Sequence, residues 1–425
     1  MNKVSINEMV KAVLRLQAND HGFTLIGIGP MSRTLIKASL ELGKERDFPL
    51  MYIASRNQVD AKPLGGGYVC DWDQYDFKNT IAEIAKEVEF DGLYYLCRDH
   101  GGPWQRDNER NSHLAEDVAM NLAKASYIED IKSGFDLLHI DPTKDPHEVG
   151  KVVPLDIVLQ RTVELIEYCE DARKNLHLPP IGYEVGTEET NGGLTSMETY
   201  EAFIQMLNKE LSSKNLPQPI FIVGQTGTLV RMTKNVGTFN ATTAKGLADT
   251  ARKYGVGLKE HNGDYVSDDI LLLHPSLGIT ATNVAPEFGK VETRALLELV
   301  KVEQQAFEHG LIDQLSNLGN DLLIEAINSE RWRKWMIGPQ TNLDRDSIFE
   351  NQELAKDVLD IAGHYTFNTE RVKNSLTKLY ENLAKIKIDG ERYVINKLKV
   401  SINTYVDGFN LEGSTSSILK EAGNA

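Results

Sequence analysis

Cysteine is scarce in this sequence, with only three among 425 residues. Cys70, Cys97 and Cys169 are too few and too scattered for a disulfide framework or a thiolate zinc site, so we expect reduced thiols in the core or in loops. Long apolar runs are also missing, and the first residues contain no apolar core followed by a small-residue cleavage site. These absences argue against a disulfide-rich secreted domain and a membrane protein, and we expect a cytoplasmic location.

Positive charge is in deficit. Forty-six Lys and Arg residues stand against sixty-two Asp and Glu residues, a formal net charge of -16. Such a chain repels phosphate backbones and anionic lipid surfaces, so neither nucleic acid nor membrane is an expected partner. A small molecule is the more natural ligand.

Short apolar segments alternate with helical patterns along the first three hundred residues. We expect strands at residues 24–29, 50–54, 93–100, 135–140, 181–185, 220–223, 257–260 and 277–282. Eight such strand-and-helix units predict the α/β fold class and a closed (β/α)8 TIM barrel. A doubly wound open sheet is the alternative, but Gly27-Ile28-Gly29 is followed by Pro30-Met31-Ser32, so no dinucleotide-binding glycine motif opens the next helix.

The remainder of the chain shows helical periodicity, with expected helices at residues 295–309, 312–317, 322–330, 357–361 and 370–385. We therefore predict two parts: a barrel over residues 1–300 and a helical extension over residues 301–425, which packs on the barrel or on a neighbouring subunit. Residues 408–425 are rich in Ser and Gly and suggest a loose tail or an arm. A homo-oligomer is expected.

Polar side chains collect where the predicted strands end. In or just beyond those ends lie Ser55, Asn57, Gln58, Asp99, His100, Asp141, Glu184, Glu188, Gln225, His261, Asp264 and Asn283. In a barrel the carboxyl ends of all strands meet at one mouth, where the active sites of this fold are built. Residues scattered in the sequence are thus predicted to converge in space.

The stretch from Leu93 to Pro103 ends an apolar strand on Asp99-His100 and two glycines. Alone, an Asp-His dipeptide is more often a hydrogen-bonded loop pair, but here a second histidine, His261, is expected across the mouth. The two histidines and one carboxylate would form an open site for a divalent cation, while Asp99 moves protons. Glu184 and Glu188 are four residues apart, and either could bind the metal or act as a base.

Several motifs together resemble the GatZ/KbaZ family, the accessory or non-catalytic subunit of class II tagatose-1,6-bisphosphate aldolase, some of whose members are ketose 4-epimerases. The resemblance rests on Ser55-Arg56-Asn57-Gln58-Val59, Gly66-Gly67-Tyr68, Asp99-His100 with Gly102-Pro103, His139-Ile140-Asp141, Val185-Gly186-Thr187-Glu188 with Gly192-Gly193, Glu260-His261 with Asp264-Tyr265, the 330–335 segment with Gly338, and Gly363-His364-Tyr365-Thr366 with Arg371. Asn283-Val284-Ala285-Pro286-Glu287 stands where the family usually has Lys-Val-Gly-Pro-Ala, which indicates a divergent member.

The resemblance implies a class II aldolase-like barrel in which an Asp-His pair supplies a proton-transfer acid and a zinc ligand. We therefore expect a metal-dependent enzyme that acts on a ketose or ketose phosphate by aldol cleavage or C4 epimerisation. The alternative is a non-catalytic subunit that stabilises a separate catalytic aldolase. The expected metal is zinc, or else manganese, bound by His100, Glu188 and His261. The expected catalytic residues are Asp99, Glu184 and Asp141, and Asp141 is also the reserve metal ligand. The expected substrate-binding residues are Ser55, Asn57, Gln58, Gln225, Asp264 and Asn283.

Overall fold

A computed structural model describes residues 4–148, 152–186 and 193–423 of the chain. Eight parallel strands close into a barrel in the order β1-β10-β9-β6-β5-β4-β3-β2. They are β1 (Leu25–Ile28), β2 (Leu50–Ser55), β3 (Tyr94–Gly101), β4 (Leu137–Ile140), β5 (Gly182–Gly186), β6 (Phe221–Val223), β9 (Gly257–Glu260) and β10 (Ala281–Val284). The predicted (β/α)8 barrel is confirmed.

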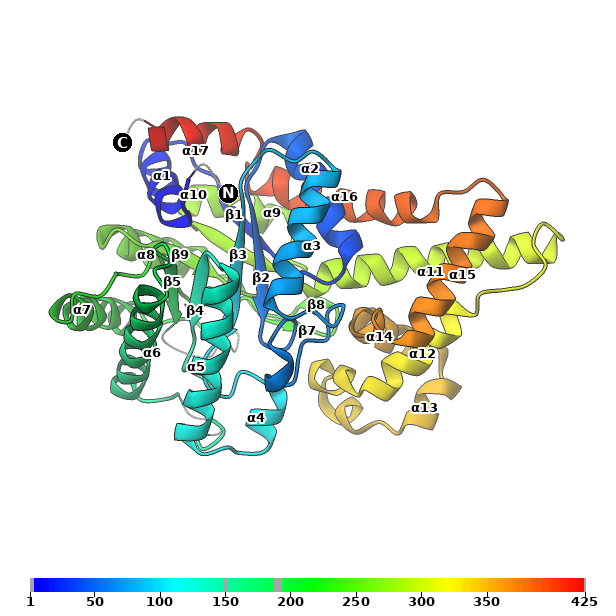
Figure 1. Cartoon of the computed structure of the whole chain (residues 1–425), viewed down its shortest axis with the longest axis horizontal. Coiled ribbons are helices and arrows are strands. Elements are labelled where there is room, and N and C mark those ends of the chain that lie inside the picture. Colours follow the sequence, from blue (N-terminus) through cyan, green and yellow to red (C-terminus); the bar gives the residue numbers. More distant parts are fainter. Residues whose placement is uncertain (1–3, 149–151, 187–192, 424–425) are drawn as a thin grey trace.

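Helices wrap the barrel, as predicted from their periodicity (Figure 1). The longer ones are α1 (Ile6–Ala18), α2 (Arg33–Arg46), α3 (Gln74–Glu87), α5 (Glu116–Ser133), α6 (Leu155–Asn175), α7 (Met197–Ser213), α8 (Ala241–Lys253) and α11 (Pro286–Glu308). Short helices α4 (Asp107–Asn111), α9 (Asp268–Leu271) and α10 (His274–Leu277), the 3-10 turn η1 (Lys62–Leu64) and a hairpin of β7 (Val230–Arg231) and β8 (Lys234–Asn235) fill the loops.

The eighth strand begins later than predicted. Residues 274–277 form α10 because Pro275 lies in its first turn and Gly278, with φ +78°, ends it in the left-handed region. Leu277 therefore belongs to a helix, and β10 starts at Ala281. The shift moves the strand's carboxyl end to Val284 and puts Asn283 on β10 itself.

The helical extension consists of α12 (Leu318–Ser329), α13 (Arg345–Glu350), α14 (Gln352–Ala362), α15 (Glu370–Lys385), α16 (Gly390–Gly408) and α17 (Ser414–Gly423), with 3-10 turns η2 (Arg331–Trp335), η3 (Gly338–Asn342) and η4 (Gly363–Thr366). Helix α11 runs unbroken through residue 300, so barrel and extension share one helix. Figure 1 shows the extension projecting to one side, from which α16 returns to pack on α2. A separate small core lies in the extension around the fully buried Trp332.

The prediction of a loose tail at residues 408–425 is wrong. Residues 414–423 form α17, which packs on α1, and the side chain of Ile418 is fully buried there. Arg15 of α1 also forms an ion pair with Glu421 at 2.7 Å. The Ser-rich composition does not indicate a helix, because the few apolar side chains of α17 are buried only by packing against the folded barrel.

Within the ranges described, no helix is both long and apolar enough to cross a membrane.

We expect Ile418→Ala to lower the free energy of unfolding by about 2–4 kcal/mol, because it leaves a cavity between α17 and α1. Urea denaturation followed by circular dichroism measures this change. The control is Val400→Ala, since Val400 is 70% exposed and its loss should cost less than about 0.5 kcal/mol. Equal stability of the two variants would show that α17 is not held by this contact.

Candidate functional site at the barrel mouth

The end of β3 is irregular and carries two of the predicted site residues, Asp99 and His100. The pairing register with β4 shifts between Arg98 and Gly101, and His100 has φ +43°, in the left-handed region. Such bulges re-aim side chains next to active sites. A Cβ on Gly101 would come within 2.7 Å of the His139 carbonyl oxygen, so the glycine lets the ends of β3 and β4 approach closely.

That approach brings together three histidines from three strands. One ring nitrogen each from His100 (β3), His139 (β4) and His261 (just after β9) lies within 4.8 Å of the other two, and the ring centroids of His100 and His261 are 4.7 Å apart. The convergence of His100 and His261 was predicted, whereas His139 was missed as a site residue. The signal was present, because alternate residues of a strand share a face, and His139 precedes Asp141 by two.

A carboxylate holds each of the two predicted histidines. The Nδ1 of His100 is 2.6 Å from Asp141 Oδ2, and the Nε2 of His261 is 2.8 Å from Glu184 Oε1. Each carboxylate accepts a hydrogen bond from the N–H of its ring, which turns the other nitrogen of each ring toward the centre of the mouth. These two nitrogens, His100 Nε2 and His261 Nδ1, face each other at 3.1 Å. Two lone pairs at that distance repel unless a proton or a cation lies beside them.

The donor set fits a divalent cation. Imidazoles oriented by carboxylates are typical of zinc sites, and imidazole with carboxylate also suits manganese. His139 is neutral, since burial lowers its pKa to about 4. Its Nδ1 accepts the His100 backbone N–H, and its buried Nε2 has no hydrogen-bond partner in the described part of the chain. The predicted third ligand, Glu188, lies outside the described residues.

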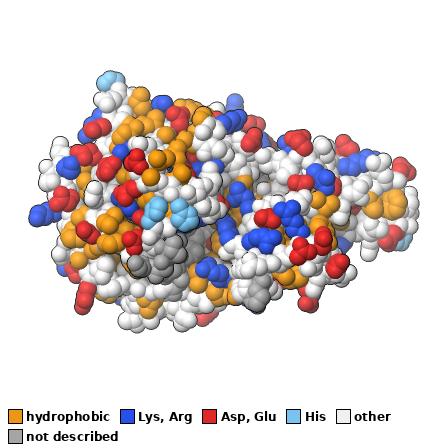
Figure 2. All heavy atoms as spheres, turned by 90° about the horizontal axis from the view of Figure 1, so that it is seen from below, with side chains coloured by type: hydrophobic (Ala, Val, Ile, Leu, Met, Phe, Trp, Pro, Cys, Tyr) orange, Lys and Arg blue, Asp and Glu red, His pale blue; other side chains and the backbone are white. Residues whose placement is uncertain are grey.

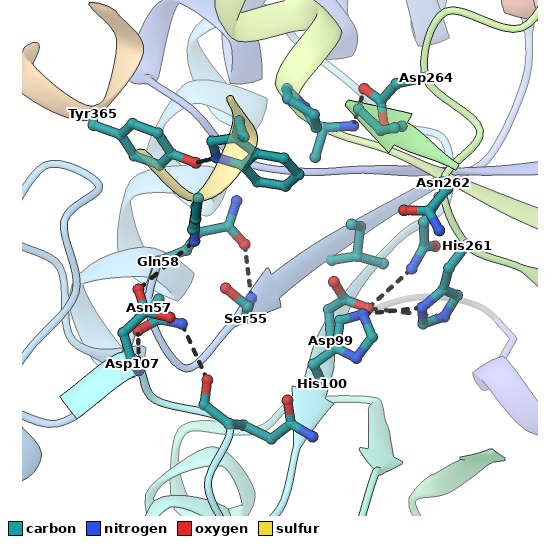
Figure 3. A pocket seen from close by; sticks show the side chains of 18 of the residues that line it. Ser55, Asn57, Gln58, Asp99, His100, Asp107, His261, Asn262, Asp264 and Tyr365 are labelled. Atoms are coloured by element: carbon teal, nitrogen blue, oxygen red, sulfur yellow. Dashed lines mark hydrogen bonds and ion pairs between the residues drawn. The ribbon is translucent and has the colours of Figure 1, made fainter. Parts of the chain in front are cut away.

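Asp99 lies beside the histidines and lines the pocket at the mouth (Figure 3). Its Oδ1 accepts a hydrogen bond from Asn283 Nδ2 at 3.0 Å and is 4.0 Å from His261 Nε2. Burial opposes ionisation of this carboxyl, but the charges of His100, His261 and Lys259 outweigh it, so the pKa of Asp99 is below its ordinary value. An ionised carboxylate facing a pocket can accept a proton.

Glu184 occupies a different position from the one expected of a catalytic base. It is fully buried, and its Oε2 pairs with Lys259 Nζ at 2.5 Å while its Oε1 holds His261. Burial raises the pKa of Glu184, but the charge of Lys259 lowers it by more, so this carboxyl stays ionised. It is not among the described residues that line the pocket. The structure gives Glu184 contacts that orient His261, as Asp141 orients His100.

The pocket has a volume of about 400 Å³, which is in the usual range for small-ligand sites. Of the predicted substrate-binding residues, it is lined by Ser55, Asn57, Gln58, Asp264 and Asn283. Gln225 is buried, and its backbone N–H donates to Thr195 Oγ1 at 2.7 Å. It is not among the described residues that line the pocket. The extension adds four lining residues that the sequence analysis did not assign to the site, namely Lys334, Trp335, His364 and Tyr365.

Asp264 follows β9 in the sequence, and its side chain contacts the start of α11. Its Oδ1 accepts hydrogen bonds from the backbone N–H groups of Ala285 at 2.9 Å and Glu287 at 2.8 Å. Burial raises the pKa of Asp264 to about 8, and the nearby charge of Glu287 adds to this effect. Asp264 is therefore protonated over part of the neutral range, where most aspartates are ionised.

Fold and site together define a (β/α)8-barrel protein whose mouth joins three histidines to buried carboxylates beside a pocket of small-molecule size. The chain belongs to the D-tagatose-1,6-bisphosphate aldolase subunit GatZ/KbaZ-like family, whose model matches residues 10–405. The resemblance noted in the sequence is thereby confirmed, and the family places the chain in aldolase-related carbohydrate metabolism.

Solved structures show the same fold at low sequence identity. A probable tagatose 6 phosphate kinase from Sinorhizobium meliloti 1021 is 19% identical, with a TM-score of 0.73 over 91% of this chain and 100% of that one. A fructose-bisphosphate aldolase from Campylobacter jejuni is 12% identical, with a TM-score of 0.53 over 97% of this chain and 96% of that one. No curated protein matches the chain.

The raised pKa of Asp264 predicts a pH-dependent loss of stability. The unfolded chain releases this proton near pH 4, but the native chain keeps it up to about pH 8, so the native state is penalised progressively as pH rises through that window. We expect Asp264→Asn, which keeps the acceptor oxygen, to remove a loss of a few kcal/mol between pH 5 and pH 8 in urea denaturation. Parallel pH curves for the two proteins would contradict this. Asp269→Asn, at an exposed position, is the control.

Proposed function

We propose that this protein is a divalent-metal-dependent carbohydrate enzyme that acts on a ketose or ketose phosphate by retro-aldol and aldol chemistry, as a C4 epimerase or an aldolase. One observation carries the proposal: His100 and His261, each held by a carboxylate, turn their free nitrogens toward each other beside the ionised Asp99. Family membership supports the substrate class. A cytoplasmic location and a homo-oligomer remain predictions.

His100 and His261 would hold the cation, with His139 or Glu188 as the third ligand. Zinc is the expected metal and manganese the alternative. A bound cation supplies Lewis-acid polarisation of the substrate carbonyl. Asp141 and Glu184 keep the two histidines in the tautomers that leave one nitrogen of each available.

Asp99 is the proposed general base. It accepts the proton of the C4 hydroxyl, the C3–C4 bond breaks, and the bonding electrons move toward the C2 carbonyl. An aldehyde forms at C4, and the other fragment becomes an enediolate. If both fragments leave, the reaction is a cleavage; if the aldehyde turns and recombines, it is an epimerisation at C4. Asn283 orients the Asp99 carboxylate through its hydrogen bond.

The alternative is a non-catalytic subunit of a separate aldolase, and the family description, which names an aldolase subunit, favours it. The two hypotheses differ in what the chain does alone. Ketose interconversion or cleavage by the purified chain with zinc or manganese, followed by chromatography, would exclude the purely accessory role. Activity only after addition of a catalytic aldolase would support it.

The first prediction for the proposed enzyme concerns metal binding. We expect His100→Ala and His261→Ala each to lose the cation and the activity while keeping the fold, because groups at an open barrel mouth bury little of the core. Plasma mass spectrometry after dialysis against zinc measures the bound metal, and circular dichroism checks the fold. His309→Ala, exposed at the far end of α11, is the matched control. Undiminished zinc in both site variants would refute the proposed ligands.

The second prediction concerns Asp99. Replacing it by Asn should leave the metal in place and lower kcat by a factor on the order of a hundred or more, as expected for a lost general base. Steady-state kinetics and metal analysis of the same preparation give the two readouts. Unchanged turnover with full metal occupancy would assign the base to another residue.

A further inference from the structure

The extension forms one wall of the pocket. Lys334 and Trp335 come from η2, and His364 and Tyr365 from η4. The Trp335 indole N–H donates to the Tyr365 hydroxyl at 3.0 Å, and Figure 3 shows Tyr365 on the side of the pocket opposite His261. Residues almost two hundred positions or more beyond the histidines of β3 and β4 thus complete the binding site.

Positively charged side chains from both the barrel loops and the extension line the pocket, although the chain as a whole carries a net charge of -16. Four cationic side chains line the pocket: Arg110, Lys144, Arg231 and Lys334. Figure 2 shows Lys and Arg side chains gathered where the barrel meets the extension. The carboxylates of Asp99, Asp107, Asp141 and Asp264 line the pocket as well, so an anionic ligand is attracted only where the cations outnumber them.

A single carboxylate, that of Asp107, lies close to two of these cations and to a third, Arg331. It lies 2.7 Å from Arg110, 3.7 Å from Lys334 Nζ and 3.9 Å from Arg331. One negative charge cannot balance three positive ones. Burial, together with the charges of Arg331 and Arg110, lowers the pKa of Lys334 against the opposing effect of Asp107, so these cations repel one another. A second anion at this wall would relieve that repulsion.

His364 adds unused hydrogen-bonding capacity beside the cations. It is 2% exposed and lines the pocket, yet neither ring nitrogen has a hydrogen-bond partner in the described ranges. Its ring packs against Gly289 in the first turns of α11, where a Cβ would come within 2.6 Å of it. A buried imidazole without a partner is costly, and it is expected where a ligand supplies one.

The position where barrels of this fold often bind phosphate is filled by the chain itself. Such sites use the loops after the seventh and eighth strands and a helix N-terminus. Here the seventh and eighth strands are β9 and β10, and the N–H groups of Ala285 and Glu287 at the start of α11 already bind Asp264. The N–H of Tyr265 likewise binds the Glu287 carboxylate at 2.5 Å. Two acidic side chains thus occupy the place of a phosphate.

We propose that the pocket binds its ketose through a single anionic group, a phosphate or a carboxylate, held by Lys334 and Arg110 with His364 beside them, and that it has no place for a second phosphate at the start of α11. The proposal rests on the proposed function in taking the ligand to be a ketose. It departs from a bisphosphate substrate, because the backbone N–H groups at the start of α11 already bind Asp264 and offer no place for a second phosphate.

Calorimetric titration of the full chain, loaded with zinc, with four probes tests the proposal: fructose, fructose 6-phosphate, fructuronate and fructose 1,6-bisphosphate. At least one of the two singly substituted anions should bind about tenfold or more tightly than fructose, and the preferred one identifies the anion as phosphate or carboxylate. The bisphosphate should bind no tighter than the monophosphate. The proposal fails if fructose binds as tightly as both anions, if the bisphosphate binds tenfold tighter than the monophosphate, or if no probe binds.

Variants separate a charge contact from a loosened wall. Lys334→Gln should weaken binding of the preferred anion about tenfold and leave fructose unchanged, Lys334→Arg should restore it, and Asp107→Asn should tighten it, because the competing carboxylate is gone. Lys253→Gln, which removes an exposed lysine paired with Glu201, is the matched control. Equal losses for fructose and for the anion in Lys334→Gln would overturn the proposal.

The two proposals can fail separately. Anion binding that depends on Lys334, in a chain without turnover, would leave this inference standing and defeat the proposed enzyme. Turnover of a ketose that is indifferent to Lys334→Gln would do the reverse.

Discussion

The mouth of this barrel depends on the hydrogen bonds that His100 and His261 each form with a buried carboxylate. Asp141 and Glu184 fix which nitrogen of His100 and of His261 is protonated, and therefore which two nitrogens face the centre. Without those carboxylates the rings could rotate or exchange tautomers, and the two nitrogens would not face each other in a fixed arrangement. Lys259 of β9 forms an ion pair with Glu184, so a buried charge inside the barrel fixes the carboxylate that orients His261.

A second set of buried charges supports the neighbouring strand ends. Arg98, inside β3, pairs with Asp130 of α5 and donates to the carbonyl oxygens of Ala54 in β2 and of Val59 just after β2. These charges are removed from water, so the loss of one partner would leave the other uncompensated at a cost of several kcal/mol. The tips of β2 and β3 are thereby held together, which keeps Ser55 and Asp99 on one side of the pocket.

The extension is part of the site as well as of the fold. Helix α11 starts at the mouth and continues into the extension, and η2 and η4 return to the pocket that α11 borders. The barrel end supplies the histidines and carboxylates of the mouth, and the extension supplies Lys334, Trp335, His364 and Tyr365 to the pocket wall. The two sets of residues lie on different elements, so the wall can change without direct changes at the histidines.

Much of this could be read from the sequence, because it depends on local pattern. Strand and helix alternation determined the barrel, and polar residues at strand ends predicted that Asp99, His100 and His261 meet at one mouth. Tertiary structure decided what depends on distance. His139 joins the histidine cluster only because Gly101 lets β3 and β4 approach closely, and the hydrogen bonds of Glu184 and Asp141 to histidines are visible only in three dimensions. Helix α17 is held by its packing on α1. Lys334 and His364 reach the pocket through the tertiary path of the chain, which no sequence periodicity predicts.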